Sequence, residues 1–184
     1  MISNHSGVME IILHFHNCHF MNESKCPVPR EQQPTNEFIE LSKSRVFSWP
    51  KTKKSLILIL AKFWLGSFVL FLLISSGSVY FKTSFLKYML LSLFSSLSIP
   101  LLITIRLYLG WNHVFKRLTS ERIEYEESGW YDGQVWIKPV VLKEKESLIA
   151  SIEVKPILKN LIQIISIILI LSLSGILLFQ NNNF

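Results

Sequence analysis

Four carboxylate side chains stand close together in a short polar stretch of the sequence, among several aromatic side chains. The carboxylates are Glu124, Glu126, Glu127 and Asp132, and the aromatic residues are Tyr125, Trp130, Tyr131 and Trp136. Carboxylates at this spacing could hold a divalent cation, or act as an acid–base pair if burial separates their pKa values. Tryptophan and tyrosine, when exposed, are favoured anchors for a protein partner.

We interpret this stretch first as the solvated surface of a β-hairpin. Docking of a partner by the aromatic residues ranks second, and a metal or catalytic site ranks last, because short motifs of this kind are weak evidence. No catalytic residue and no metal ligand is therefore assigned. The four aromatic residues are the candidates for partner docking, and the four carboxylates are a candidate cluster.

A second group with metal-like composition lies near the beginning of the sequence. It consists of His14, His16, Cys18 and His19. The spacing matches no zinc module, and no second cluster completes a site. Residues 1–20 are expected to be a variable tail, with either Met1 or Met21 as the start of translation.

The composition indicates a membrane protein. Charged residues make up only 17% of the sequence, below the quarter or so that is typical of soluble domains. The formal net charge is +6, but the basic residues flank apolar blocks and form no module that reads nucleic acid. The lipid bilayer is the expected partner, and nucleic acid is not.

Three apolar blocks, at residues 56–81, 88–106 and 161–179, predict transmembrane helices, because each is long enough to cross the bilayer. Lys62 is placed at the interface, where a lysine can extend its charge toward water. Pro100 predicts a kink in the second span, with a neighbouring helix satisfying the carbonyl that proline frees. The fold class is therefore an all-α integral membrane protein with three transmembrane helices.

Two polar regions lie outside these spans. Residues 21–54 are punctuated by proline and predict one short helix, from Thr35 or Asn36 to Ser42. Residues 107–156 begin with apolar positions at helical spacing, which predict that the second span continues as an amphipathic helix near the bilayer surface. A further helical pattern runs from Lys143 to Ile152.

Between these two helices the pattern changes to alternation. Ile123 and Tyr125 alternate with charged residues, and Val135 and Ile137 alternate in the same way. The intervening Ser-Gly and Asp-Gly pairs are turn signals. They predict a hairpin whose loop is longer than two residues.

The distribution of basic residues predicts the orientation in the membrane. Eight lysines and arginines lie at or before Lys62 and nine lie between Arg106 and Lys159, whereas the opposite side has only Lys82 and Lys87. The positive-inside rule then places the N-terminus and residues 107–156 inside, and the C-terminus outside.

Several runs also resemble a known family. They are CPVPREQQPTNEF, RLYLGW, YEESGWYDGQVWIKP and LIASIEVKPIL, and they lie between about Cys26 and Ile162. The sequence resembles the plastid and cyanobacterial family called hypothetical chloroplast open reading frame thirty-six, whose plant relatives are described as conserved in the green lineage and diatoms. The resemblance implies a plastid membrane protein whose inside faces the stroma, so that residues 21–54 and 107–156 are stromal. It carries over no reaction, cofactor or catalytic residue.

The preferred hypothesis is a non-enzymatic membrane protein that helps assemble or maintain photosynthetic complexes. Residues 121–139 would dock its partners, which are expected to be subunits of those complexes. The alternative is a small transport or metal (iron) homeostasis component of a plastid membrane. A membrane-embedded enzyme ranks third, because the spans contain no histidine and no carboxylate pair.

Overall fold

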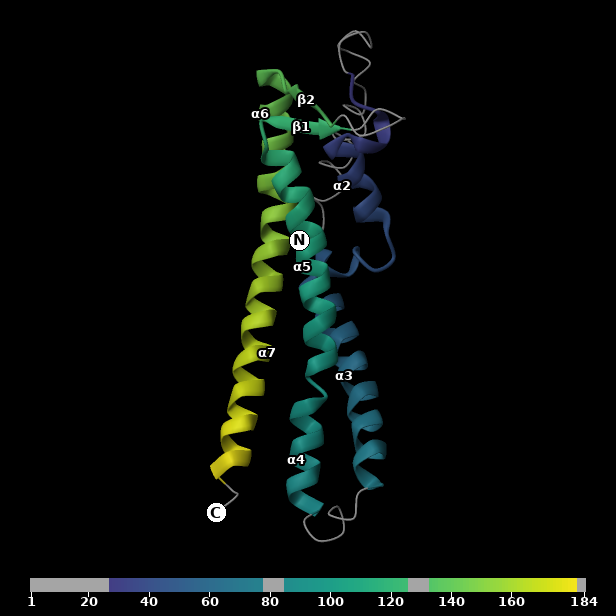
Figure 1. Cartoon of the computed structure of the whole chain (residues 1–184), viewed down its shortest axis with the longest axis vertical. Coiled ribbons are helices and arrows are strands. Elements are labelled where there is room, and N and C mark those ends of the chain that lie inside the picture. The colour runs from purple at the N-terminus through teal and green to yellow at the C-terminus, as the bar shows by residue number, and fades with distance from the viewer. Residues whose placement is uncertain (1–26, 78–84, 126–132, 182–184) are drawn as a thin grey trace.

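The computed structural model describes residues 27–77, 85–125 and 133–181. Over these ranges the chain is mostly helical, and its long helices run side by side along the longest axis of the molecule (Figure 1). Three helices are long and apolar enough to cross a membrane, over Lys53–Ser76, Met89–Thr119 and Val140–Gly175. The number of predicted spans is thereby confirmed for the described residues, and insertion into a bilayer remains a prediction.

The outward faces of the long helices are apolar. Helix α3 (Lys53–Ser76) leaves Leu73 69% exposed, and helix α7 (Lys155–Asn181) leaves Ile170 66% exposed. Soluble monomers rarely expose continuous apolar surface of this kind, whereas hydrocarbon-facing helices do. The pattern therefore fits helices that face lipid.

The second candidate span consists of two helices in line, α4 (Phe85–Ser95) and α5 (Ser98–Thr119). They are separated just before Pro100, which has no N–H to donate to the carbonyl of Ser96. The hydroxyl of Ser67, on the neighbouring helix α3, lies 2.9 Å from this carbonyl oxygen and shares its proton between it and the carbonyl of Trp64 in its own helix, at 2.8 Å. The predicted break and its repair by a neighbouring helix are both confirmed.

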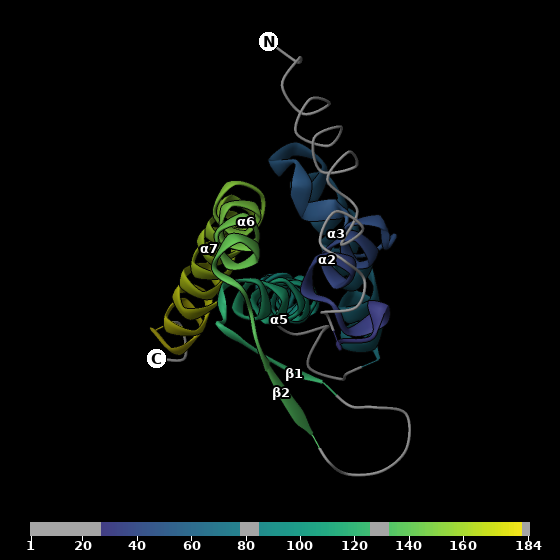
Figure 2. The same ribbon diagram turned by 90° about the horizontal axis from the view of Figure 1, so that it is seen from above.

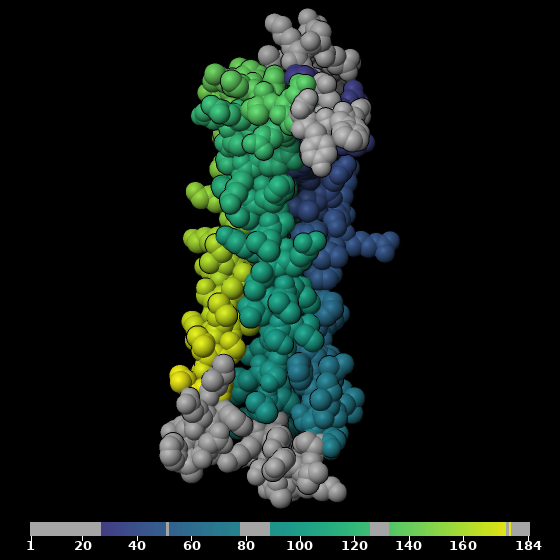
Figure 3. Space-filling view, viewed as in Figure 1, coloured from purple at the N-terminus to yellow at the C-terminus, as the bar shows by residue number. Residues whose placement is uncertain are grey.

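Helix α5 lies at the centre of the molecule. Figure 3 shows it in teal between α7 on one side and α3 with the N-terminal segment on the other. Leu107, Trp111 and Leu118 project from α5 and are fully buried. They form one core with Leu56 and Leu60 of α3 and with residues of α7 and of the helix that precedes it.

The apolar face of the last three turns of α5 corrects one prediction. Trp111, Val114 and Leu118 are buried within the protein and do not lie on a bilayer surface. The segment is a straight continuation of α5, because other elements of the same chain cover its apolar face. One of them is α2 (Pro34–Lys43), whose Phe38 ring packs edge-on against Trp111, with ring centroids 6.2 Å apart.

The N-terminal segment lies against α5 through several such contacts. It contains two short 3-10 turns, η3 (Arg30–Gln32) and η4 (Trp49–Lys51), on either side of α2. Helix α2 begins at Pro34 with Gln33 as its cap, two or three residues before the predicted cap at Thr35 or Asn36, because proline is pre-organised for the first helical position. Between α2 and η4, the carbonyl of Phe47 accepts a hydrogen bond from Trp111 Nε1 at 3.2 Å.

Helix α6 (Val140–Ile149) runs through a π-helical turn, η6 (Ala150–Val154), directly into α7. The π turn precedes Pro156, whose ring would otherwise clash with a carbonyl of the preceding turn. Ala150 and Val154 in this turn are fully buried in the core. The predicted helical pattern toward Pro156 is confirmed, and it continues through Pro156 as the start of the last candidate span.

The predicted hairpin is present between α5 and α6. Strand β1 (Arg122–Tyr125) pairs antiparallel with β2 (Gln134–Ile137), so the connecting segment is longer than two residues. The hairpin crosses the helices near their polar end, and it projects sideways from them when viewed from above (Figures 1 and 2). It therefore forms the part of the described chain that reaches farthest from the helices in that view.

Candidate functional site

Charged side chains converge on the last turn of α5, where the hairpin, α2 and α6 all meet. We call this set the clamp, and it consists of Arg117, Glu37, Lys138 and Glu146. The last carbonyls of a helix have no partner within the helix, and they carry the negative end of the helix dipole. The clamp places cations at this end.

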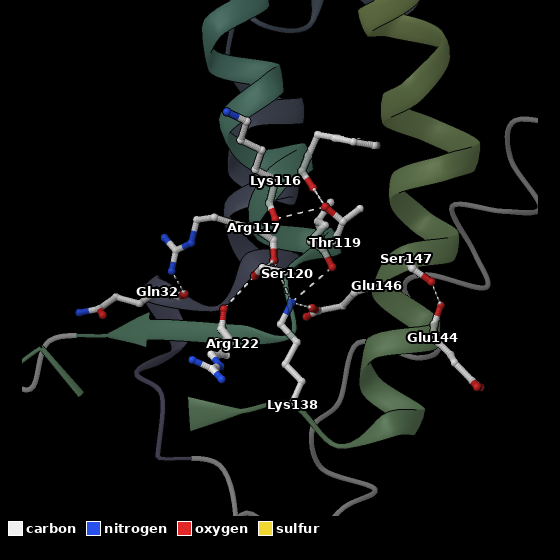
Figure 4. Close-up of polar contacts among 12 residues, drawn as sticks. Gln32, Lys116, Arg117, Thr119, Ser120, Arg122, Lys138, Glu144, Glu146 and Ser147 are labelled. Atoms are coloured by element: carbon white, nitrogen blue, oxygen red, sulfur yellow. Dashed lines mark hydrogen bonds and ion pairs between the residues drawn. The ribbon is translucent and has the colours of Figure 1, made fainter. Parts of the chain in front are cut away.

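Lys138, the residue after β2, is the centre of the clamp. Its side chain is fully buried, and Nζ donates to the carbonyl of Arg117 at 2.8 Å and to that of Leu118 at 3.3 Å. Figure 4 shows the side chain rising from the end of the hairpin toward the last turn of α5. The lysine thereby caps α5 and ties the hairpin to it.

Glu146 supplies the countercharge from α6. Its Oε2 lies 2.5 Å from Lys138 Nζ, and its side chain is only 2% exposed. Burial raises the pKa of Glu146, and the hydrogen bond and charge of Lys138 partly oppose that rise. Because Glu146 lies well before the apolar run of α7, this pair belongs to the polar end of the molecule.

Arg117 makes the third connection, to the N-terminal segment. It forms an ion pair with Glu37 of α2, and its Nη2 donates to the carbonyl of Gln32 at 2.9 Å. Burial raises the pKa of Glu37, and the nearby Arg117 charge counteracts this effect. The final two turns of α5 therefore hold α2, the hairpin and α6 at once.

The two faces of the hairpin differ. Ile123 and Tyr125 are buried against Val28, with Trp136 packed beside them. Tyr125 Oη also donates to Gln134 Oε1 across the strands at 2.7 Å. The predicted alternation is confirmed in β1, since Arg122 and Glu124 lie on the exposed face. It is wrong in β2, where Val135 and Ile137 are exposed.

The burial of Tyr125 and Trp136 shows which of the predicted docking residues in the described part of the hairpin are exposed. Tyr125 is 5% exposed and Trp136 is half-buried, so both rings hold the hairpin to the N-terminal segment. Tyr125 is therefore not an exposed anchor, because its ring is used in the small core beneath the hairpin. Trp130 and Tyr131 lie outside the described residues, and their docking role stays a prediction.

The structure describes only one residue of the candidate carboxylate cluster. Glu124 is exposed on β1 beside Arg122, whereas Glu126, Glu127 and Asp132 lie outside the described residues. Within residues 27–77, 85–125 and 133–181, no group of three or more histidine, cysteine, aspartate or glutamate side chains could hold a metal ion. The residues of the N-terminal tail with metal-like composition also lie outside these ranges.

Sequence reasoning missed the clamp itself. One signal was available, because Glu146 falls on the same helical face as Leu142, Ile149 and Ala150, so a carboxylate interrupts an apolar stripe. Lys138 gave no such signal, because it follows a strand and precedes Pro139. Its burial depends on the end of a distant helix.

The clamp can hold the hairpin in a fixed position. Its four residues, all described in the structure, offer no exposed reactive group. Its buried charges are paired with one another or with helix carbonyls. Beside the charged Arg122 and Glu124, the hairpin and the start of α6 expose four apolar side chains, Val135, Ile137, Val140 and Val141, each between 54% and 70% exposed. Such a surface suits binding to another polypeptide.

The fold and this site define a class of protein: a helical protein with three candidate membrane spans and a clamped polar end that carries a hairpin. The chain belongs to the CGLD27-like family, conserved in the green lineage and diatoms 27, whose model matches residues 26–167. The clamp and all three long helices fall wholly or largely inside this match. The predicted resemblance is confirmed.

Three relatives illustrate the family. The uncharacterized protein ycf36 of Porphyra purpurea is 39% identical over 162 residues, covering 85% of this chain and 95% of that protein. Its counterpart in Cyanophora paradoxa is 35% identical, covering 79% of this chain and 92% of that protein. The protein conserved in the green lineage and diatoms 27, chloroplastic, of Arabidopsis thaliana is 39% identical over 76% of this chain and 43% of its own length. No solved structure matches the chain.

Proposed function

We propose that this chain is a non-enzymatic, multi-pass plastid membrane protein that helps assemble or maintain photosynthetic membrane complexes. Its N-terminal segment and residues 107–156 would face the stroma, and its partners would be subunits of those complexes. The names of the relatives support a plastid location, since the Arabidopsis relative is described as chloroplastic. The three long apolar helices support the membrane location.

One observation carries the proposal: the polar end is built to hold a hairpin in a fixed position. Arg117, Lys138 and Glu146 fix three elements on the last turns of α5. Buried ion pairs are costly to desolvate, and their best-attested use is to specify one arrangement. A fixed hairpin that projects from the helices (Figure 2) suits a docking element better than a reaction centre.

The test is partner recovery from the native membrane. The tagged chain is extracted in mild detergent, and co-purifying proteins are identified by mass spectrometry, for the wild type and for the double variant Trp130→Ala plus Tyr131→Ala. Subunits of a photosynthetic complex should be recovered with the wild type and lost with the variant. Arg45→Ala, at an exposed position on the segment between α2 and η4, serves as the control that retains them.

Two outcomes would count against this function. A chain that always migrates without other proteins, even after crosslinking in intact membranes, would contradict the docking role. Stoichiometric iron bound to the purified full-length chain would instead favour the alternative, a small transport or metal-homeostasis component.

A further inference from the structure

Exposed cations on the three long helices lie at nearly the same height along the molecule. They are Lys53 and Lys54 at the start of α3, Arg106 on α5 and Lys159 on α7, and we call them the cation belt. Within the described ranges, none of the four forms an ion pair with another residue. The belt is therefore free to bind an anion from outside the chain.

A contact between α3 and the α4–α5 pair gives the height of the first three cations. Ser67 Oγ lies 2.9 Å from the carbonyl oxygen of Ser96, so these two residues are level. The two helical segments run in opposite directions along the same axis (Figure 1). Counted from this contact toward the polar end, Arg106 lies about 15 Å along the axis and Lys54 about 20 Å, at about 1.5 Å per residue.

A contact between α4 and α7 gives the height of Lys159. Gly175 lies so close to the Phe94 ring that a Cβ atom at this glycine would overlap it. Counted from this contact toward the polar end, Lys159 lies about 24 Å along α7, and Arg106 about 18 Å along α4 and α5. All four belt cations therefore lie within about 6 Å of one another in height, close to one helical turn.

The belt marks one boundary of the apolar part of the molecule. Lys87, close to the start of α4, marks the other. The distance from Lys87 to Arg106 along α4 and α5 is about 29 Å, and the hydrocarbon core of a bilayer is about 30 Å thick. When the helices cross a bilayer, the belt therefore lies at the height of the lipid headgroups.

The long helices carry no carboxylate at this height. Residues 49–62, 101–114 and 155–168 cover it on α3 with its preceding turn, on α5 and on α7. They contain seven lysines and arginines and no aspartate or glutamate. Basic residues next to a bilayer attract anionic lipids, so the charge of this zone suits an anionic headgroup.

Lys62 extends the basic zone toward the hydrocarbon. It is exposed on α3, about 12 Å farther into the candidate span than Lys54. Its neighbours one turn before and nearly one turn after, Leu58 and Leu65, are 57% and 60% exposed, so its surroundings are apolar. A lysine in such a position extends its ammonium toward the headgroups. An anionic headgroup is therefore the counter-ion that Lys62 can reach.

We propose that the cation belt and Lys62 bind anionic lipid headgroups, through phosphate or sulfonate oxygens, in the leaflet at the polar end. The belt occupies one height on three helices, which matches the plane of a lipid surface better than a patch on another protein. Headgroups bound there hold the clamp and the hairpin at a fixed height above the bilayer. The inference rests on the membrane location in the proposed function, but not on a photosynthetic partner.

The first test removes one belt cation from each helix. The full-length chain in a neutral detergent is titrated with phosphatidylglycerol, which is anionic, or with phosphatidylcholine, which has no net charge. Native mass spectrometry counts the bound lipids. The wild type should bind phosphatidylglycerol more strongly. Lys53→Gln plus Arg106→Gln plus Lys159→Gln should lower the ratio of the two association constants at least about tenfold, since each cation near a membrane surface contributes about fivefold.

The matched control removes the same charge beyond the belt, with Lys116→Gln plus Arg122→Gln plus Lys143→Gln. Lys116 lies about 15 Å beyond Arg106, which exceeds the roughly 8–10 Å over which salt screens exposed charges. The control should keep the preference of the wild type. An equal loss in the control would mean that only net charge matters, and it would overturn the belt as a binding surface.

The wild type alone can also overturn the proposal, whether or not the variants fold. Equal binding of the two lipids would do so. If the wild type showed no lipid preference and the belt variant lost a protein from the membrane extract, the belt would belong to that protein, and the proposal would again be wrong.

Alkaline carbonate extraction of the native membranes separates this inference from the proposed function. A chain released by carbonate would not span a bilayer, and both would fail. A chain that resists carbonate and recovers photosynthetic subunits, but has no preference for phosphatidylglycerol, would contradict only the lipid-binding belt.

Discussion

The two ends of α5 show two ways of satisfying carbonyl groups that a helix leaves without partners. At its beginning, inside a candidate span, the carbonyl freed by Pro100 accepts a hydrogen bond from the Ser67 hydroxyl. At its end, in the polar region, the carbonyls of Arg117 and Leu118 accept hydrogen bonds from the Lys138 ammonium. One end uses a neutral donor, and the other uses a cation that needs its own countercharge.

The difference follows from the surroundings and from the helix dipole. A buried ammonium within the candidate spans would carry a large desolvation cost, whereas a neutral hydroxyl on a neighbouring helix does not. At the C-terminal end the dipole favours a cation, and a carboxylate on α6 completes the pair. The hydroxyl joins two helices, whereas the cation and its carboxylate join three elements. The second end is therefore expected to be the more sensitive to mutation.

The largest expected effect comes from removing the countercharge. Glu146→Ala leaves Lys138 buried beside two carbonyls with no carboxylate, and breaking a buried ion pair in this way typically costs roughly 3–5 kcal/mol. Unfolding of the purified chain by denaturant in mixed micelles measures the loss. A loss below about 1 kcal/mol, the range of exposed pairs, would contradict the central place given to the clamp.

Replacing both members of the pair separates the pair's contribution to stability from its role in specifying the arrangement. With Lys138→Met plus Glu146→Leu, the free energy of unfolding should recover to within about 1–2 kcal/mol of the wild type or exceed it, as for other buried pairs replaced by apolar residues. The hairpin should then lose its fixed position, because the carbonyls at the end of α5 lose their donor. Faster backbone hydrogen exchange in β1 and β2, at unchanged exchange in α7, would show this.

An intermediate loss of stability is expected where α5 is held by close packing and not by hydrogen bonds, at the contact between Gly110 and Phe47. A Cβ atom at Gly110 would lie 2.4 Å from the Phe47 ring, so Gly110→Ala forces the ring or the segment that carries it to shift. Overpacking of this kind costs typically about 1–3 kcal/mol. Gly66→Ala is the control, because a Cβ there meets nothing within 4 Å. The control should be neutral or slightly stabilising, since alanine favours the helix.

The neutral end of α5 should be less sensitive. Ser67→Ala removes the donor to the Ser96 carbonyl, and hydrogen bonds between membrane helices contribute about 0.6 kcal/mol on average and up to about 1.7. Ser76→Ala, whose hydroxyl bonds only within its own helix and is exposed, is the control and should have no effect. A cost for Ser67→Ala equal to that of Glu146→Ala would remove the proposed difference between the two ends.

The sequence predicted the parts of this fold that depend on local pattern. The three long helices, the break before Pro100 with its repair by a neighbour, and the hairpin all followed from length, proline chemistry and alternation. The clamp did not follow, because Lys138 and Glu146 meet only after α5 ends between the hairpin and α6. The face of Trp111 and Leu118 was assigned to the bilayer for the same reason: amphipathic spacing shows that a face is covered, but not by what.

The smallest effect is expected from the exposed ion pair between Glu121 and Lys143, and it should differ in its pH dependence from the buried pair. The hydrogen bond and the charge of Lys143 lower the pKa of Glu121 from the usual value of 4.5. The contribution of this ion pair to the free energy of unfolding is therefore present above pH 4.5, and it is lost as the pH falls through the lowered pKa of the folded state. Burial raises the pKa of Glu146 from 4.5, so the contribution of its titration is present below pH 4.5 and is lost as the pH rises through the raised pKa.

Denaturant unfolding at a series of pH values should separate the two carboxylates by sign. The wild type minus Glu121→Gln should show a small difference in free energy that shrinks as the pH falls below 4.5, because the lost charge no longer matters once Glu121 is protonated. The wild type minus Glu146→Gln should show a difference that grows as the pH is lowered from neutrality toward 4.5, because protonation relieves the buried carboxylate. Raising the salt concentration should shrink only the first difference, since an exposed pair is screened and a buried pair is not. If both differences in the free energy of unfolding changed with pH in the same direction, Glu146 would be solvated like Glu121. The contrast between a buried pair in the clamp and an exposed pair on the surface would then be wrong.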